Sequence, residues 1–218
     1  MKITLQHCLL FFVFVVSFSE VSRLYAQNDC TDAIVVCGNS GYENLEVSGA
    51  GIQELNGNNS CGSQENNSIW FDITVVSDGT LAFTLTPESA AITEDYDFFI
   101  YGPNVDCNNL GESIRCSTTN PQNAGLSSNL TGLSTTETDT SEGPGPDGNS
   151  FVSAIEVSSG DRFFLVVDRP IGSSNFSLEW TGTATFDNPP VNIVTPGGAD
   201  ISACDTSIPI NDGVSELI

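Results

Sequence analysis

Alternation of apolar and polar residues with a period of two is the dominant pattern of this chain. In residues 69–75 the odd-numbered positions are Ile, Phe, Ile and Val, and in residues 81–85 they are Leu, Phe and Leu. This period is typical of strands with one buried face, and the Asp78-Gly79 pair between the two segments is typical of a turn. The pattern therefore predicts a hairpin formed by residues 69–75 and 81–85.

Strand-like segments recur along most of the chain, while helical periodicity is hard to find. The further predicted strands cover residues 33–36, 42–47, 97–101, 151–157, 162–167 and 176–180. About eight or nine strands in this length predict an all-β fold, a jelly-roll-like sandwich of two packed antiparallel sheets. Residues 117–150 interrupt the pattern with a long polar stretch rich in Gly and Pro, which is typical of a functional or disordered loop.

The first 26 residues predict a secretion signal. Lys2 precedes an apolar run over residues 9–18, and Leu24-Tyr25-Ala26 resembles a cleavage site. A membrane anchor is the alternative, but the run is shorter than the ~20 apolar residues of a spanning helix. We therefore expect export with cleavage, no membrane insertion of the mature chain, and a secreted or cell-surface location.

The rest of the chain divides near residue 186. Residues 27–186 have a suitable length for a single β-sandwich domain with a sizeable core. The Asp187-Asn-Pro-Pro190 segment then stops strand pairing, because proline cannot donate a ladder hydrogen bond. We interpret residues 187–218 as a linker and the start of an incomplete second domain. A disordered tail is the alternative.

Net charge and amino-acid composition exclude several classes of function. Removal of residues 1–26 takes away Lys2, Arg23 and Glu20 and leaves three basic and 27 acidic residues, a net charge of −24. Such a chain repels phosphate backbones, so we expect no nucleic-acid partner. The remaining 192 residues contain no histidine and no lysine, which excludes Ser-His-Asp, Cys-His and Ser-Lys sites. We therefore predict that the chain is not an enzyme.

Six cysteines remain after the signal, and an even number in an exported chain predicts disulfides. Cys107 and Cys116 are close in sequence and flank a turn-rich segment, so we expect them to pair. Cys37 with Cys61 is a second expected pair. Cys30 and Cys204 are then left over, and Cys204 could pair beyond the end of this chain.

One acidic segment has the composition of a calcium site. Glu94, Asp95 and Asp97 precede a Gly-Pro turn, and Asp147 in the long loop could supply a further ligand. Calcium takes six to eight oxygen ligands, which loops dense in Asp, Asn and Gly can provide. The alternative is that these carboxylates are solvated turn residues. We name calcium as the one candidate cofactor.

Two further kinds of site are compatible with the residues. A pair of carboxylates across a cleft could form a glycosidase, but the spacing along the chain does not test this. Trp70 and Trp180 could form platforms for sugar rings. The alternative is that both are core residues, which is more common for tryptophan at strand positions.

The order of the strand motifs resembles that of a known group of proteins. The motifs are Cys30-x6-Cys37, Cys61, Ile69–Ile73, Asp78–Leu81, Asp95–Gly102, Cys107, Cys116, Ser159–Asp168 and Phe176–Ala184. Over about residues 28–186 they resemble the N-terminal β-sandwich of secreted Bacteroidetes surface proteins, which are gliding-associated and use type IX secretion. The aromatic-Asp strands are also similar to bacterial pre-peptidase C-terminal domains.

The resemblance implies a non-enzymatic binding or structural module of a cell-surface, adhesin-like protein, of which this chain is a fragment. Its expected partners are the secretion machinery and an extracellular glycan or protein ligand. An accessory domain of a secreted hydrolase and a calcium-dependent carbohydrate-binding module are the alternatives. A sorting module of the kind such proteins carry at the C-terminus is not found in the sequence.

Overall fold

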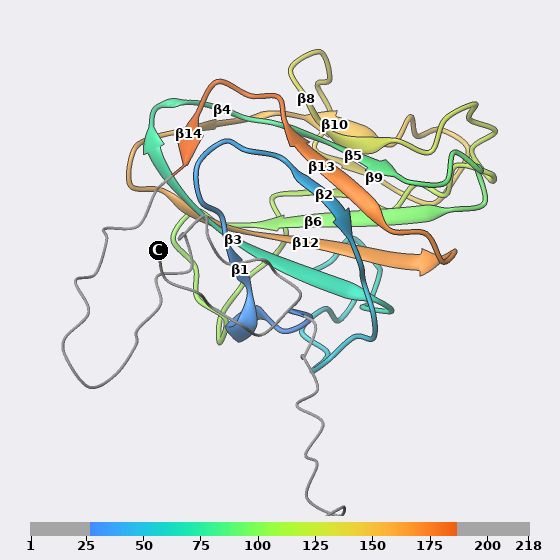
Figure 1. Ribbon diagram of the computed structural model, residues 1–218, viewed down its shortest axis with the longest axis horizontal. Coiled ribbons are helices and arrows are strands. Elements are labelled where there is room, and N and C mark those ends of the chain that lie inside the picture. The colour runs from blue at the N-terminus through green and yellow to red at the C-terminus, as the bar shows by residue number, and fades with distance from the viewer. Residues whose placement is uncertain (1–26, 187–218) are drawn as a thin grey trace, which may run out of the picture.

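The computed structural model describes residues 27–186, and these residues form an all-β sandwich (Figure 1). The larger sheet has the order β1-β3-β12-β6-β7-β9, with β14 also paired to β3. Its strands are β1 (Ile34–Val35), β3 (Ser68–Ser77), β6 (Asp95–Tyr101), β7 (Arg115–Ser117), β9 (Ser141–Glu142), β12 (Arg162–Ile171) and β14 (Thr185–Phe186). The predicted signal and the predicted second domain lie outside the described residues.

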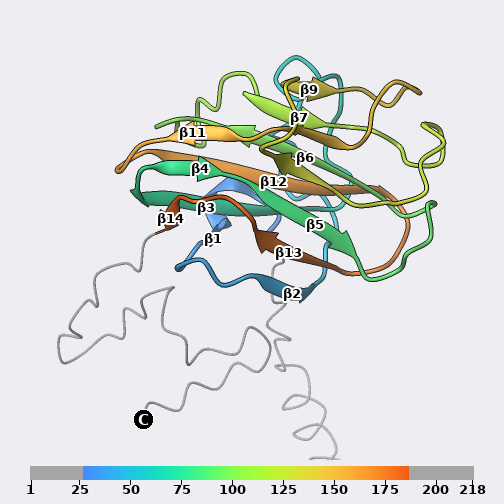
Figure 2. The ribbon, with the colours of Figure 1, turned by 90° about the horizontal axis from the view of Figure 1, so that it is seen from above.

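A smaller sheet packs against the larger one and has the order β10-β8-β5-β13-β2. Its strands are β2 (Tyr42–Leu45), β5 (Phe83–Pro87), β8 (Thr131–Ser134), β10 (Phe151–Ser153) and β13 (Phe176–Trp180). A third, two-stranded sheet joins β4 (Gly79–Leu81) to β11 (Ile155–Val157), and a short 3-10 helix, η1, spans Cys30–Asp32. Figure 2 shows β5, β13 and β2 on one side and β12, β6, β7 and β9 on the other.

The predicted all-β sandwich is confirmed, and its central strand pairs are antiparallel as expected. Strand β12 pairs antiparallel with both β3 and β6, and β13 pairs antiparallel with both β5 and β2. The sheet edges add parallel pairs, namely β1 with β3, β7 with β9 and β10 with β8. Part of the predicted 117–150 loop therefore forms strands β8 and β9.

The predicted hairpin of residues 69–75 and 81–85 is wrong, although both segments are strands. Strand β3 lies in the larger sheet and pairs with β12, whereas β5 lies in the smaller sheet and pairs with β13 and β8. The chain thus crosses between the sheets after Asp78-Gly79. Both strands have an apolar face, and facing sheets bury these two faces against each other.

The larger sheet is buried on both faces. Its inner face packs on the smaller sheet through alternate aromatic residues such as Phe71, Phe98 and Phe163, all at most 1% exposed. Its outer face carries a second apolar cluster. The buried members of this second cluster are Cys30, Leu55, Trp70, Phe99, Tyr101, Leu110, Cys116, Phe164 and Val166. Successive residues of β3, β6 and β12 therefore alternate between two cores.

Loops, not strands, cover the outer face. Helix η1 and the segment of residues 48–67 lie below the larger sheet in Figure 1, on the side away from β5 and β13. Leu55 of this segment is fully buried in the outer cluster. A covering without a sheet has few ladder hydrogen bonds, so it depends on other links to the sheet.

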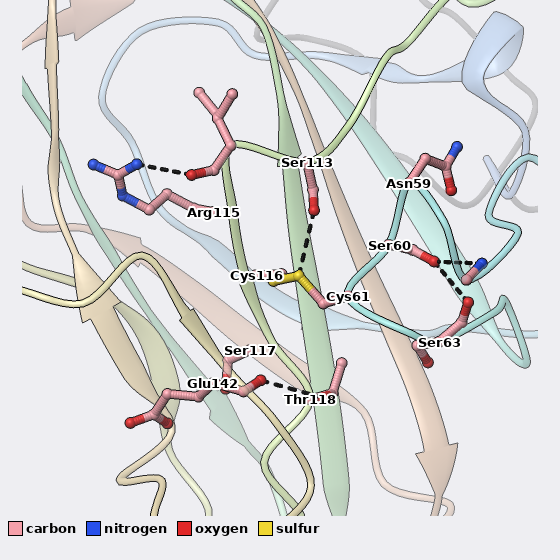
Figure 3. Close-up of a disulfide and its surroundings, with 12 residues drawn as sticks. Asn59, Ser60, Cys61, Ser63, Ser113, Arg115, Cys116, Ser117, Thr118 and Glu142 are labelled. Atoms are coloured by element: carbon pink, nitrogen blue, oxygen red, sulfur yellow. Dashed lines mark hydrogen bonds between the residues drawn. A yellow bond between two sulfur atoms is a disulfide. The ribbon is translucent and has the colours of Figure 1, made fainter.

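Two disulfides supply such links. Cys30 pairs with Cys107, with Cα atoms 5.6 Å apart, and Cys61 pairs with Cys116, with Cα atoms 6.5 Å apart. Figure 3 shows the second bridge joining the loop of residues 59–63 to the strand that contains Cys116. Each bridge therefore ties the N-terminal covering segment to the chain that follows β6.

The predicted Cys107–Cys116 and Cys37–Cys61 pairings are wrong, although all four residues are disulfide-bonded. Cys116 lies on the outer face of β7, opposite Phe99, and is 1% exposed beneath the covering segment. Pairing therefore follows position in the fold and not distance along the sequence. Strand β7 places Cys116 next to Cys61, and the β6–β7 loop places Cys107 next to Cys30.

Candidate functional site

The acidic residues predicted to bind calcium are only partly brought together. Strand β6 places Asp95 and Asp97 on the outer face of the larger sheet, each 4% exposed. Glu94 instead turns to the 172–174 loop, where Ser173 N–H and Ser174 N–H donate to its Oε2 at 2.9 and 3.1 Å. Burial raises the pKa of Glu94, but these hydrogen bonds outweigh it, and the pKa falls below its usual value.

Asp147 lies elsewhere, in a cleft of about 270 Å³ that the 139–148 loop encloses. Glu142 lines the same cleft, but its oxygens accept hydrogen bonds from Thr119 Oγ1, Asn149 N–H and Ser150 N–H. Its role is therefore to close the loop.

Asp168 joins Asp95 and Asp97 as a third buried carboxylate that the sequence analysis did not single out. It lies opposite Asp97 in the β12–β6 pair and is fully buried. Its Oδ1 accepts from Asn66 N–H at 2.7 Å and Asn67 N–H at 2.8 Å, and its Oδ2 accepts from Asn66 Nδ2 at 2.8 Å. We refer to Asp95, Asp97 and Asp168 as the aspartate cluster.

A sequence signal for Asp168 existed. The period of two that puts Phe164 and Val166 on one face of β12 puts Asp168 on the same face. What the sequence did not reveal is that this face is buried, because that depends on the covering segment.

The aspartate cluster has perturbed acidities. Burial raises the pKa of Asp95 to about 6, with a hydrogen bond from Asn120 opposing the rise and the charge of Asp168 adding to it. Burial, followed by repulsion from Asp95 and Asp168, raises the pKa of Asp97 well above its usual value. Asp95 Oδ1 and Asp97 Oδ1 are both buried without a hydrogen-bond partner.

A second pair of acids, Glu54 and Glu65, belongs to the covering segment of residues 48–67. Glu65 is 3% exposed, accepts from Trp70 Nε1 at 2.8 Å, and accepts from Glu54 N–H at 2.8 Å. Burial raises the pKa of Glu54 to about 7, and contact with the Glu65 carboxyl adds to the rise. Glu54 Oε1 accepts from Cys30 N–H at 3.0 Å, whereas Glu54 Oε2 is buried without a hydrogen-bond partner.

Glu54 also lines a polar cleft of about 480 Å³ between the 54–59 and 107–112 loops. The other residues of its wall are Asn56, Asn58, Asn59, Cys107, Asn108, Asn109, Leu110, Gly111 and Glu112. The two disulfides join these loops to neighbouring segments, and Tyr101 Oη donates to Asn59 O at 3.0 Å beneath them. We refer to this feature as the asparagine cleft.

The amides of the asparagine cleft differ in their availability. Asn59 is used within the loop, since its Nδ2 donates to Glu54 O and its Oδ1 accepts from Asn56 N–H. The side chains of Asn58, Asn108 and Asn109 are exposed, and no hydrogen bond to another residue of the 27–186 region engages them. These three side chains are free to contact a ligand.

Both tryptophans are core residues. Trp70 is fully buried and donates to Glu65, and Trp180 is 9% exposed and packs on Phe186 with ring centroids 4.8 Å apart. Neither ring forms an exposed platform for a sugar.

The three arginines of residues 27–186 are all engaged in structural contacts. Arg115 donates to Ser153 O and Arg169 donates to Ser174 O and Val47 O. Arg162 forms an ion pair with Asp72 at 2.7 Å. None of the ion pairs found within residues 27–186 involves the aspartate cluster or the asparagine cleft.

The described part of the chain contains neither a preassembled metal-binding group nor a membrane-spanning helix. No group of three or more His, Cys, Asp or Glu side chains there has an arrangement that could hold a metal ion. No helix in residues 27–186 is both long and apolar enough to cross a membrane. Comparisons with protein-family models, with curated proteins and with solved structures found no match.

Proposed function

We propose that this chain is a secreted, non-enzymatic module of an adhesin-like surface protein and that it binds a neutral glycan in the asparagine cleft. The observation that supports the proposal is the set of three free side-chain amides, Asn58, Asn108 and Asn109, around one cleft. An amide offers both a donor and an acceptor, which suits the hydroxyl groups of a sugar. The cleft size lies within the range of small-molecule sites.

The electrostatics of the cleft support a neutral ligand. Glu54 and Glu112 lie in its wall, and no arginine does. A chain of net charge −24 outside its signal would repel an anionic sugar or peptide before contact.

The rigidity of the cleft supports a role in binding. Binding energy is lost when loops must be ordered on association, so a preformed cleft binds more tightly. The Cys30–Cys107 and Cys61–Cys116 bridges restrict both walls in advance.

A glycan array probed with the disulfide-bonded full-length chain tests this proposal. We expect binding to neutral oligosaccharides and a loss of about tenfold or more in affinity for Asn58→Ala with Asn108→Ala, because two polar contacts are removed. Asn123→Ala is the matched control, since Asn123 is an exposed asparagine outside the cleft.

Two outcomes would reject the proposal. Equal binding by wild type and the double variant would place the ligand elsewhere. Release of reducing sugar from a bound polysaccharide, lost on Glu54→Gln or Glu112→Gln, would instead indicate a glycosidase.

A further inference from the structure

The aspartate cluster concentrates negative charge, and no basic side chain of residues 27–186 is paired with it. Asp95, Asp97 and Asp168 are each at most 4% exposed on one face of two paired strands. A buried carboxylate without a partner is strongly disfavoured, so buried charges are normally paired or bound to a metal. The three arginines in the described part of the chain contact other groups, and none of them contributes to the pKa shift of Asp95 or Asp97.

The three carboxylates play different parts. Asp168 is satisfied, because both of its oxygens accept hydrogen bonds from Asn66 and Asn67. Asp95 uses only Oδ2, which accepts from Asn120 Nδ2 at 2.8 Å. Asp95 Oδ1 and Asp97 Oδ1 remain as buried acceptors without donors.

Protonation would not supply hydrogen-bond partners for both of these oxygens. Asp97 is not hydrogen-bonded to Asp95 or Asp168, which act on it through charge alone. A protonated Asp97 would find no carboxylate acceptor in the cluster, whereas a cation can bridge oxygens that lie farther apart than a hydrogen bond allows.

The surroundings add neutral oxygens. The loop that covers the cluster is attached at Cys61, through its bridge to Cys116, and at Asn66 and Asn67, through Asp168. Ser63 lies between these points; its Oγ donates to Gln64 O at 3.5 Å, and its side chain is near enough to Asp97 to lower the pKa of that carboxyl. Figure 3 shows Ser63 on this loop, two residues beyond the bridge.

We propose that Asp95 Oδ1 and the Asp97 carboxylate bind one divalent cation of the Ca²⁺ class beneath the 61–67 loop, with Ser63 Oγ as a neutral ligand. Asp168 adds charge without binding the ion directly. A site with two carboxylate ligands is compatible with the finding that no three-carboxylate metal group exists in residues 27–186. Ca²⁺ suits it better than Mg²⁺, which demands near-ideal octahedral geometry.

This inference is independent of the asparagine cleft, and its test needs no glycan. Calcium is titrated by calorimetry into the disulfide-bonded full-length chain at pH 8, and melting temperatures are recorded in calcium and in EDTA. We expect one ion per chain and a rise of about 5–10 °C at a hundred times the Kd, because the ion binds only the folded state. Magnesium should bind at least tenfold more weakly.

Asp97→Asn should abolish both the calcium heat and the temperature rise, and it should raise the melting temperature in EDTA, since one buried charge is removed. Asp147→Asn is the matched control, because it removes the same charge from an exposed position and should keep the full calcium response. Asp95→Asn provides a second variant if Asp97→Asn does not fold.

The proposal is overturned if calcium and EDTA give the same wild-type melting curve at pH 8. It is also overturned if an Asp97 or Asp95 variant keeps the calcium response. Lowering the pH toward 5.5 should weaken calcium binding in the wild type, because protons then compete for the same oxygens.

Discussion

The two faces of the larger sheet are both buried, but they are covered by different means. The inner face meets a second sheet through apolar side chains, and Phe98 there packs edge-on against Phe83 with centroids 5.1 Å apart. The outer face is covered by loops that are held by two disulfides and by hydrogen bonds to Glu65 and Asp168.

The difference shows what a loop needs in order to cover a sheet. A facing sheet satisfies its own backbone and buries apolar area along its whole length. A loop must have its N–H groups satisfied locally, and here buried carboxylates accept them. The outer face therefore contains titratable groups and crosslinks, while the cluster on the inner face is apolar.

The largest expected effect is on the inner face. Phe98→Ala should lower the free energy of unfolding by about 3–5 kcal/mol, because it removes a fully buried ring and leaves a cavity. Urea unfolding followed by tryptophan fluorescence measures the loss. Phe98→Leu, which keeps most of the volume, should cost much less. A loss below about 1 kcal/mol for Phe98→Ala would mean that the sheets do not pack tightly here.

The second-largest expected effect distinguishes the outer face of the larger sheet from its inner face. Cys61→Ala with Cys116→Ala should lower the free energy of unfolding by about 2–4 kcal/mol, because the bridge closes a long loop in the unfolded chain. Hydrogen exchange should accelerate first at the Ser113 amide, which donates to Asn59 O across the two loops. Protection in β5 and β13, at the inner face, should change least. A uniform acceleration over both faces would contradict the distinction.

The smallest effect is a pH dependence that belongs to the outer face. The pKa of Glu54 rises to about 7 and that of Asp95 to about 6, so the folded state binds more protons than the unfolded state at mildly acidic pH. Stability should therefore fall as the pH rises from about 4.5 to 7 and level off above it, by about 1–2 kcal/mol after allowance for solvent screening.

Urea midpoints at pH 4.5, 6 and 7.5, recorded in EDTA, measure this slope. Glu54→Gln should reduce it, because the amide does not titrate, while Phe98→Leu on the inner face should leave it unchanged. Stability that increases over the same range would show that the outer-face carboxylates are not buried as described. Below about pH 4.5 the lowered pKa of Glu94 acts in the opposite sense, because protonation weakens its contacts with the 172–174 loop.

The sequence by itself determined the class of fold and the position of most strands. The period of two in residues 69–75, 162–167 and 176–180 corresponds to β3, β12 and β13, because side chains of a strand alternate between its faces whatever the neighbours are. Composition, not alternation, singled out Glu94, Asp95 and Asp97 as candidate calcium ligands. Composition also limited the catalytic chemistry, because the absence of histidine and lysine after residue 26 is read directly from the sequence.

Only the tertiary structure decided which strands and cysteines are partners. Strand β3 pairs with β12, about ninety residues away, and Cys116 pairs with Cys61, because both choices depend on which apolar faces bury each other. The burial of Asp168 and the Glu54–Glu65 contact depend on the covering segment, whose polar sequence has no period that reveals what it covers. Alternation is a local property of the chain, whereas burial of the second face is a property of the whole fold.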